Sequence, residues 1–191
     1  MEIIFATANL NKLKEVQEML GSKYTLKTPA DFEITEDIEE TADTLEGNAA
    51  IKAEYIWSKL GKTCFSDDTG LEVKALNGEP GVRSARYAGE GKNSEDNMVK
   101  LLHELEDKED RSAQFRCSIA LIWEGKTYNF DGICEGEIAE EKIGEGGFGY
   151  DPIFIPKGYD KSFAELSSEE KNLISHRGLA INALRAWLEK Q

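Results

Sequence analysis

A long alternation of apolar and polar residues is the feature that most constrains how this chain folds. Apolar side chains fall at every second position along a stretch that comprises Ala113, Phe115, Cys117, Ile119, Leu121 and Trp123. A period of two is that of a β-strand with one buried face. Glu124, Gly125 and Lys126 then turn the chain into a second extended stretch that runs through Phe130 and Ile133. We therefore expect a long antiparallel hairpin at the centre of a mixed sheet.

Helical spacing of apolar residues appears in the segments on both sides of this hairpin. A buried strand over residues 3–6 precedes a helix that ends at Gly21, and a second helix is expected over residues 48–60. A third helix follows Asn93 or Ser94 as its cap, and a last helix has a buried stripe of Ala180, Leu184, Trp187 and Leu188. The expected class is α/β, with a mixed, strongly twisted sheet flanked by helices.

Composition and charge exclude several classes of protein. A chain of 191 residues with 40% hydrophobic content is expected to form one domain over residues 1–191. The formal net charge of −14 argues against a duplex nucleic acid partner, which requires a basic face. No membrane span and no signal peptide are expected. Three widely spaced cysteines and two histidines form neither a disulfide framework nor a zinc motif, so reduced cysteines and a cytoplasmic location are expected.

The first polar loop joins the N-terminal strand to the first helix and consists of Thr7, Ala8, Asn9, Leu10, Asn11 and Lys12. Backbone amides at a helix N-terminus bind anions, and a lysine there adds a full positive charge. The short polar side chains of Thr7 and Asn9 suit phosphate oxygens. The alternative is structural, because Asn and Thr are also common helix caps.

The second polar segment runs from Ser66 to Gly70 and places Asp67 and Asp68 side by side, at what the pattern predicts to be a strand end. Hard carboxylate oxygens suit magnesium, which takes only one or two protein carboxylates. A carboxylate beside the metal can also deprotonate an attacking water. The alternative is an Asx-type turn that closes with glycine.

Further acidic and basic residues are candidates for the same site. Glu39 and Glu40 are candidate second metal ligands, although a solvated acidic loop is the alternative, and Lys52 on the following helix is a candidate phosphate clamp.

The third polar loop is rich in glycine and covers residues 144–152. Its glycines allow backbone amides to approach a ligand closely, and an aromatic ring in the same loop can stack on a flat heterocycle. Its candidate ligand-binding residues are Phe148, Gly149, Tyr150 and Asp151. The alternative is a hairpin whose aromatic rings cover the core.

A fourth polar loop, over residues 167–178, contributes Lys171, His176 and Arg177. Histidine and arginine side chains can donate hydrogen bonds to heterocycle carbonyls or to phosphate. The alternative makes Ser175 a helix cap and Arg177 a solvent-facing residue of the first helical turn.

Together these pieces resemble the inosine/xanthosine triphosphate pyrophosphatase family. The resemblance covers essentially the whole chain, in the family's order and at its spacing. The matching segments are Ala6-Thr7-Ala8-Asn9 with Lys12, Glu39-Glu40-Thr41, Glu46-Gly47-Asn48-Ala49, Ser66 to Leu71, Gly78-Glu79-Pro80-Gly81 with Ser84-Ala85-Arg86-Tyr87, Gly146 to Phe154, and Ser175-His176-Arg177-Gly178. Ala8 stands where the family usually has glycine, and Thr69 replaces the commoner serine but keeps the hydroxyl.

The resemblance implies a magnesium-dependent enzyme that cleaves ITP, dITP and XTP between the α and β phosphates. It implies two lobes with the active site in the cleft between them, and a homodimer. Asp68 is expected to act as the base and as a metal ligand, with Glu40 or Glu39 as the second ligand. Lys12, Lys52 and Lys171 are expected to stabilise the leaving pyrophosphate.

For the purine, the resemblance implies that Phe148 stacks on the ring and that Asp151 holds one edge. His176 and Arg177, or backbone amides, would donate to the 6-carbonyl that adenine lacks. The alternatives are a pyrophosphatase of other modified nucleotides and a non-catalytic nucleotide-binding module.

Overall fold

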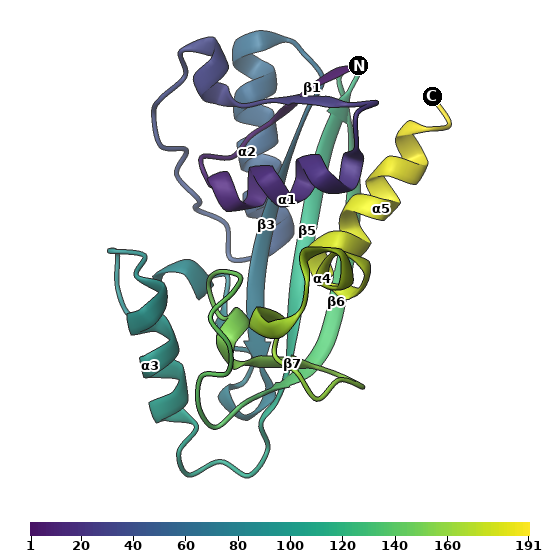
Figure 1. Ribbon diagram of the computed structural model, residues 1–191. Coiled ribbons are helices and arrows are strands. Elements are labelled where there is room, and N and C mark those ends of the chain that lie inside the picture. Colours follow the sequence, from purple (N-terminus) through teal and green to yellow (C-terminus); the bar gives the residue numbers. More distant parts are fainter. The chain divides into compact units, whose positions relative to one another are not determined.

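A mixed seven-stranded sheet is the framework of the computed structural model, which describes residues 1–191 (Figure 1). Its strands are β1 (Glu2–Phe5), β2 (Thr25–Lys27), β3 (Cys64–Val73), β4 (Pro80–Gly81), β5 (Ser112–Trp123), β6 (Lys126–Ile138) and β7 (Phe154–Pro156). The strand order is β2-β1-β3-β5-β6-β7, and β4 pairs with β3. β1 lies parallel to β2 and β3, whereas β4 and β7 run antiparallel to β3 and β6. The predicted mixed α/β class is therefore confirmed.

Five α-helices accompany the sheet: α1 (Leu10–Leu20), α2 (Leu45–Leu60), α3 (Ser94–Glu104), α4 (Ser168–Ile174) and α5 (His176–Leu188). Short 3-10 helices cover Pro29–Phe32, Lys74–Leu76, Ser84–Arg86, Asp151–Ile153 and Phe163–Glu165. The predicted stop of α1 at Gly21 is confirmed, and of the two predicted caps of α3 the structure shows Asn93. The long hairpin is confirmed as β5 and β6, and its turn has φ 50° at Glu124 and 76° at Gly125, as a tight two-residue hairpin turn requires.

The chain divides into two compact units. Unit 1 contains Met1–Asp68, Cys117–Gly132 and Arg177–Gln191, and unit 2 contains Thr69–Arg116 and Ile133–His176. The boundaries along the chain fall within β3, near the middle of the β5–β6 hairpin strands, and at the start of α5. Each unit has its own hydrophobic core.

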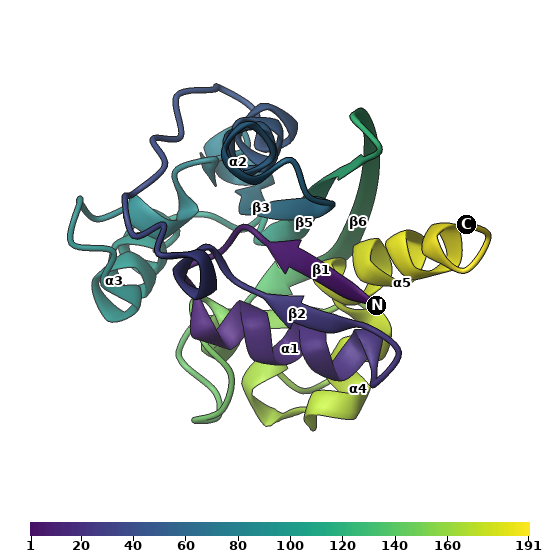
Figure 2. The same cartoon turned by 90° about the horizontal axis from the view of Figure 1, so that it is seen from above.

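Unit 1 is a sheet with helices on both faces. Figure 2 shows α2 on one side of β1 and β3, with α1 and α5 on the other side. Alternate residues of β1 supply the two faces, because Ile3 and Phe5 pack with α1 and α5, whereas Ile4 packs with α2. This packing confirms the buried strand that the apolar run predicts, and it shows why the run is continuous: both faces of β1 are covered.

Unit 2 has one core in which α3 and the glycine-rich loop meet the sheet. Buried side chains of this core include Leu101 and Leu105 of α3, Phe115 of β5, Tyr150 and Phe154. Three aromatic rings pack closely there, with ring centroids of Phe115 and Phe154 4.7 Å apart and those of Phe154 and Phe163 5.0 Å apart. The loop of residues 144–152 is therefore anchored by the buried Tyr150 and by Phe154, which follows it.

Three expectations about local structure were wrong. The segment from Ser66 to Gly70 is not a loop at a strand end but the middle of the ten-residue strand β3. The helix predicted over residues 48–60 begins earlier, at Leu45, because Thr44 caps it by accepting a hydrogen bond from the Gly47 amide. The segment before α5 contains the additional helix α4, which a capping box between Ser167 and Glu170 begins.

Candidate functional site

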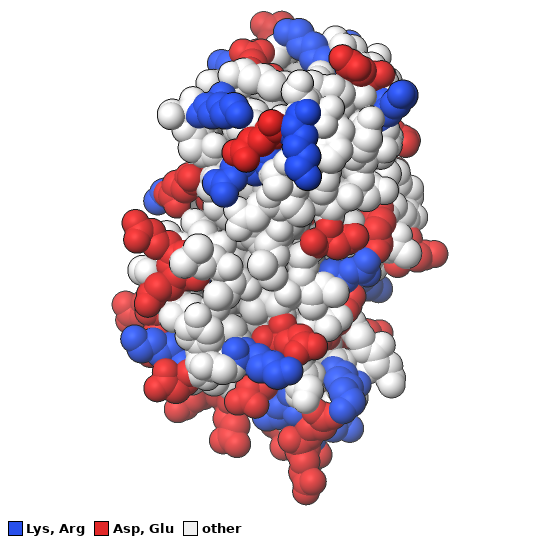
Figure 3. All heavy atoms as spheres, turned by 90° about the vertical axis from the view of Figure 1, so that its right-hand side faces the viewer, with Lys and Arg blue, Asp and Glu red and all other residues white.

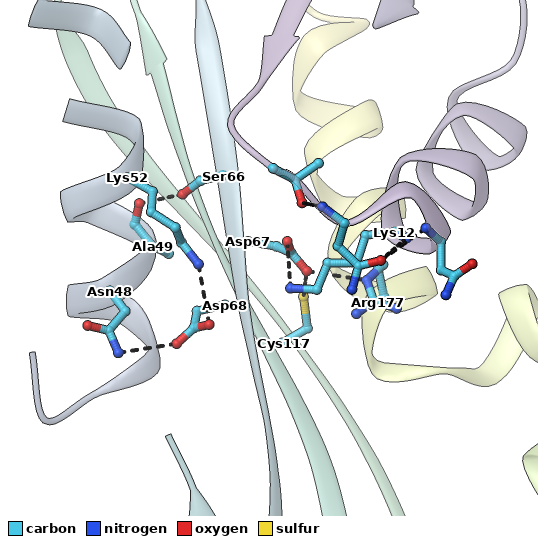
Figure 4. Close-up of polar contacts among 12 residues, drawn as sticks. Lys12, Asn48, Ala49, Lys52, Ser66, Asp67, Asp68, Cys117 and Arg177 are labelled. Atoms are coloured by element: carbon cyan, nitrogen blue, oxygen red, sulfur yellow. Dashed lines mark hydrogen bonds and ion pairs between the residues drawn. The ribbon is translucent and has the colours of Figure 1, made fainter. Parts of the chain in front are cut away.

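The two adjacent aspartates of β3 point to opposite faces of the strand, because successive side chains of a β-strand alternate. Figure 4 shows Asp68 facing α2 and Asp67 facing α1 and Arg177. Both carboxylates are buried, with 8% of Asp68 and 2% of Asp67 exposed. In the sequence the two aspartates form one acidic motif. In the structure each is the centre of its own polar cluster in unit 1.

Asp68 is held by two side chains of α2. Its carboxylate accepts hydrogen bonds of 3.3 Å from the amide of Asn48 and 3.3 Å from the ammonium of Lys52. The same ammonium forms a 2.7 Å ion pair with Glu40. Burial raises the pKa of Asp68 above its usual 3.8, although the Lys52 charge pulls it back. Asn48, which the sequence offered only as part of a motif, thus belongs to the Asp68 cluster.

The same cluster favours the protonated form of Lys52. Burial alone would lower its pKa, but the carboxylates of Asp68 and Glu40 outweigh burial and raise the pKa above the usual 10.5. Lys52 therefore stays protonated at neutral pH, as a phosphate clamp must.

The oxygens around Lys52 fit the donor chemistry of magnesium. Glu40 and Asp68 both contact one ammonium, so two carboxylates converge on a single cation position. Magnesium usually takes one or two protein carboxylates and completes its shell with water and phosphate. No group of three or more His, Cys, Asp and Glu side chains is placed so that it could hold a metal ion. Of the two predicted glutamates, Glu40 shares the Lys52 ammonium with Asp68, whereas Glu39 is exposed.

Asp67 is the centre of the second cluster. One carboxylate oxygen pairs with the Lys12 ammonium at 3.0 Å, and the other accepts from Nε of Arg177 at 3.3 Å. Arg177 Nη1 also donates to Glu15 at 2.6 Å. Burial alone would raise the pKa of Asp67, but the charges of Lys12 and Arg177 hold it well below 3.8. The alternative that placed Arg177 in solvent was wrong, because its side chain is 3% exposed.

The first loop has the geometry of a helix cap. Asn9 is the N-cap of α1 and accepts from the amides of Asn11 and Lys12, while Thr7 accepts from the amide of Asn9. Ala8, Asn9, Leu10 and Asn11 are exposed. The loop therefore presents the positive end of the α1 dipole to solvent, with the Lys12 ammonium held beside it by Asp67.

In unit 2 the glycine-rich loop closes around Asp151. The carboxylate of Asp151 accepts from the Phe148 amide at 2.7 Å and pairs with the Lys171 ammonium at 2.7 Å. That ammonium lies 4.9 Å from the centre of the Phe148 ring. Asp151 and Lys171 are nearly buried, with side chains 5% and 7% exposed. The structure therefore groups Lys171 with the residues predicted to contact the base.

The remaining predicted residues are placed as follows. Tyr150 is buried and its hydroxyl donates to the Ser84 carbonyl at 2.8 Å, so its side chain braces the loop. His176 is 3% exposed and stacks on Phe115, with ring centroids 4.6 Å apart. Gly149 has φ 64°, and Thr69 is half-buried in β3. The roles predicted for these residues toward a ligand stay predictions.

A groove of unit 2 is lined by other residues. It has a volume of about 660 Å³ and is lined by the ends of β3, β5 and β6 and by the residues of β7 and beyond, among them Glu72, Gln114, Glu135 and Tyr159. None of its lining residues is a predicted site residue. The groove and the predicted site residues are therefore separate features of the surface.

One face of the molecule shows how its charged side chains are distributed. On the face drawn in Figure 3, acidic and basic side chains are interspersed and the basic ones form no continuous patch. No helix is both long and apolar enough to span a bilayer.

Known proteins resemble this chain along its whole length. A profile of the Ham1 family matches residues 3–187. The dITP/XTP pyrophosphatase of Flavobacterium johnsoniae is 58% identical over 184 residues, which are 96% of each chain. That of Bacillus subtilis is 50% identical over 192 residues, which are 98% of this chain and 97% of the relative.

Two solved structures share the fold. The Staphylococcus aureus Ham1 protein has a TM-score of 0.91 and 46% identity, covering 100% of this chain and 99% of its own. A HAM1 protein from Coxiella burnetii has a TM-score of 0.92 and 42% identity, with full coverage of both chains. The resemblance drawn from the sequence motifs is confirmed, and the chain belongs to the Ham1 family.

Proposed function

We propose that this protein hydrolyses the non-canonical purine nucleoside triphosphates ITP, dITP and XTP to the monophosphate and pyrophosphate. Relatives that are 58% and 50% identical over nearly the whole chain are named dITP/XTP pyrophosphatases. The observation that carries the proposal is the Asp68 cluster. A buried carboxylate, fixed by Asn48 and facing Glu40 across a lysine ammonium, is suited to water activation beside phosphate.

In the proposed reaction Asp68 accepts a proton from a water molecule whose oxygen attacks the α-phosphorus. The bond from that phosphorus to the bridging oxygen of the β-phosphate breaks, and pyrophosphate leaves with the electron pair. Lys52, which is charged and held beside Asp68, compensates the negative charge that develops. Lys12, at the N-terminus of α1, is assigned to a phosphate group on the other face of β3.

Magnesium is the proposed cofactor, and Glu40 and Asp68 are the residues that would hold it. When bound, the ion would neutralise phosphate charge.

The base is assigned to residues of unit 2. The Phe148 ring offers a stacking surface, and the Asp151–Lys171 pair fixes the loop that bears it. A 6-carbonyl accepts hydrogen bonds where adenine presents an amino group, so donors such as His176 would favour hypoxanthine and xanthine over adenine. Lys171 is thereby reassigned from the phosphates to the base side, on the strength of its contacts with Asp151 and Phe148.

The test is product analysis with ITP, dITP, XTP and the four ordinary ribonucleoside triphosphates side by side, with and without magnesium. We expect ITP to give inosine monophosphate and pyrophosphate, only when magnesium is present. Release of orthophosphate and inosine diphosphate would refute the assigned bond. Binding of ITP without turnover would instead favour a nucleotide-binding module, and a preference for other modified nucleotides would favour the related class of pyrophosphatases.

A further inference from the structure

A buried carboxylate contacts two cations, one of which is Lys12 at the end of the first polar loop. Asp67, whose side chain is 1% exposed, contacts Lys12 of α1 through one oxygen and Arg177 of α5 through the other (Figure 4). The thiol of Cys117 lies 3.9 Å from the same carboxylate. Asp67 therefore connects β3, α1, β5 and α5 within unit 1, and it is enclosed on the face opposite to Asp68.

The three charged side chains of this cluster differ in their exposure to solvent. The side chain of Lys12 is 16% exposed, whereas those of Asp67 and Arg177 are 1% and 3% exposed. Lys12 is thus the member of the cluster most accessible to solvent, whereas Asp67 and Arg177 are enclosed. An ammonium has three donors, and Asp67 is the one carboxylate to which Lys12 donates, so further donors remain for a ligand.

We propose that Asp67 is a positioning residue, which sets the Lys12 ammonium at the N-terminus of α1 for phosphate binding and does not itself touch substrate or metal. The proposal rests on the proposed function only for the identity of the phosphate ligand. Its physical basis is that an unanchored lysine loses rotamer freedom when it binds, whereas one already held by a carboxylate has lost it on folding. Arg177 takes part by sharing the carboxylate, so that the charge of Asp67 is divided between two cations.

The same geometry would also arise if Asp67 opposed phosphate binding. If Asp67 merely competed with phosphate for Lys12, then removing its charge would tighten anion binding. The two readings therefore predict opposite signs for one measurement, which makes the cluster testable without turnover.

The experiment measures the dissociation constant of inorganic triphosphate by titration calorimetry for the full chain. Asp67→Asn keeps the size of the side chain and removes its charge, and we expect binding about three- to tenfold weaker. In a Lys12→Met background the same change should alter affinity less than about twofold, because the residue through which it acts is gone. Equal or tighter binding by Asp67→Asn, or a loss that adds fully to that of Lys12→Met, would overturn the proposal.

A second variant separates position from charge. Asp67→Glu preserves every charge of the cluster but moves the carboxylate by one methylene, so weaker triphosphate binding is expected from it as well. Unchanged affinity would show that charge alone matters and would overturn the positioning role. Either variant alone decides the question if the other fails to fold, which chemical denaturation would reveal.

The matched control is Asp31→Asn, which makes the same chemical change in unit 1 at a partly exposed ion pair with Lys27. We expect its triphosphate affinity to stay within about twofold of the natural protein, since exposed pairs contribute little. Kinetics with ITP provide the remaining readout: loss of anchoring should raise KM for ITP more than it lowers kcat. If the natural protein binds triphosphate but does not hydrolyse ITP, the proposed function fails while the binding test of Asp67 still stands.

Discussion

Two glycines of the same loop allow the Asp151 cluster to be tested by a single added methyl group. Gly147 has φ 71° and Gly149 has φ 64°, so alanine is strained at both positions. A Cβ at Gly147 would lie 2.1 Å from the Oδ2 atom of Asp151 and 2.8 Å from its Cγ. A Cβ at Gly149 would meet no atom within 4 Å. Gly149→Ala is therefore a matched control for backbone strain.

The expected magnitudes follow from these contacts. A left-handed backbone conformation costs about 1–2 kcal/mol for alanine. Alanine also lowers the conformational entropy of the unfolded chain relative to glycine, which offsets about 0.4–1 kcal/mol of this cost at either site. At Gly147 the carboxylate of Asp151 must also move, which breaks its 2.7 Å contacts with the Phe148 amide and with Lys171. Breaking a buried ion pair costs about 3–5 kcal/mol. Gly147→Ala should therefore be about 3–5 kcal/mol more destabilising than Gly149→Ala.

The assay is chemical denaturation of both variants and the natural protein, with the free energy of unfolding extrapolated to water. Activity toward ITP should fall with Gly147→Ala even where the variant is folded, because the Phe148 ring loses its support. Unfolding free energies of the two variants within about 1 kcal/mol of each other would refute the reasoning, since they would show that Asp151 moves at little cost.

Four further outcomes are expected. Asp68→Asn should fold normally but lose roughly two to four orders of magnitude in kcat for ITP, as expected for a lost general base; near-normal turnover would move that role to Glu40. His176→Ala should lower kcat/KM for ITP more than for ATP, so that their ratio narrows, and an equal fall for both would show that the ring does not read the base. Burial raises the pKa of the Cys134 thiol to about 11, so its alkylation rate in the native protein should rise about tenfold per pH unit between pH 7 and 10, and a plateau near pH 8.5 would contradict this. Light scattering at micromolar concentration should give the mass of a homodimer, and a monomeric mass would count against the family expectation.

The fold was largely predictable because most of its signals are local. The strand from Ala113 onward, the turn at Glu124 and the stop at Gly21 each depend on a few neighbouring residues, and the structure confirms each one. The single buried face was wrong for the second half of this strand, because Ala120 and Ile122 are buried as well. The start of α2 at Leu45 was missed because its cap, Thr44, precedes residues that do not look helical. Helix α4 was missed although the capping box of Ser167 with Glu170 is visible in the sequence.

The site was predictable as a set of residues but not as a set of partners. Lys12, Lys52 and Asp68 were identified as candidates, yet their pairing depends on which face of β3 each aspartate occupies. The segment from Ser66 to Gly70 has the sequence of a strand end, because two adjacent carboxylates are unfavourable in the middle of a strand. Only the tertiary structure supplies the cations that make such a strand stable, from α1, α2 and α5.

The position of the aspartate pair within a strand has a chemical consequence. In a loop, Asp67 and Asp68 could share one metal ion or one proton, and their roles would be interchangeable. In β3 they are separated by the strand itself, and each is fixed by different helices. Both oxygens of Asp67 are engaged, one by Lys12 and the other by Arg177. Asp68, whose burial raises its pKa, faces Lys52 and Glu40 and is the carboxylate suited to accept a proton. Strand alternation therefore gives two identical neighbouring residues distinct surroundings.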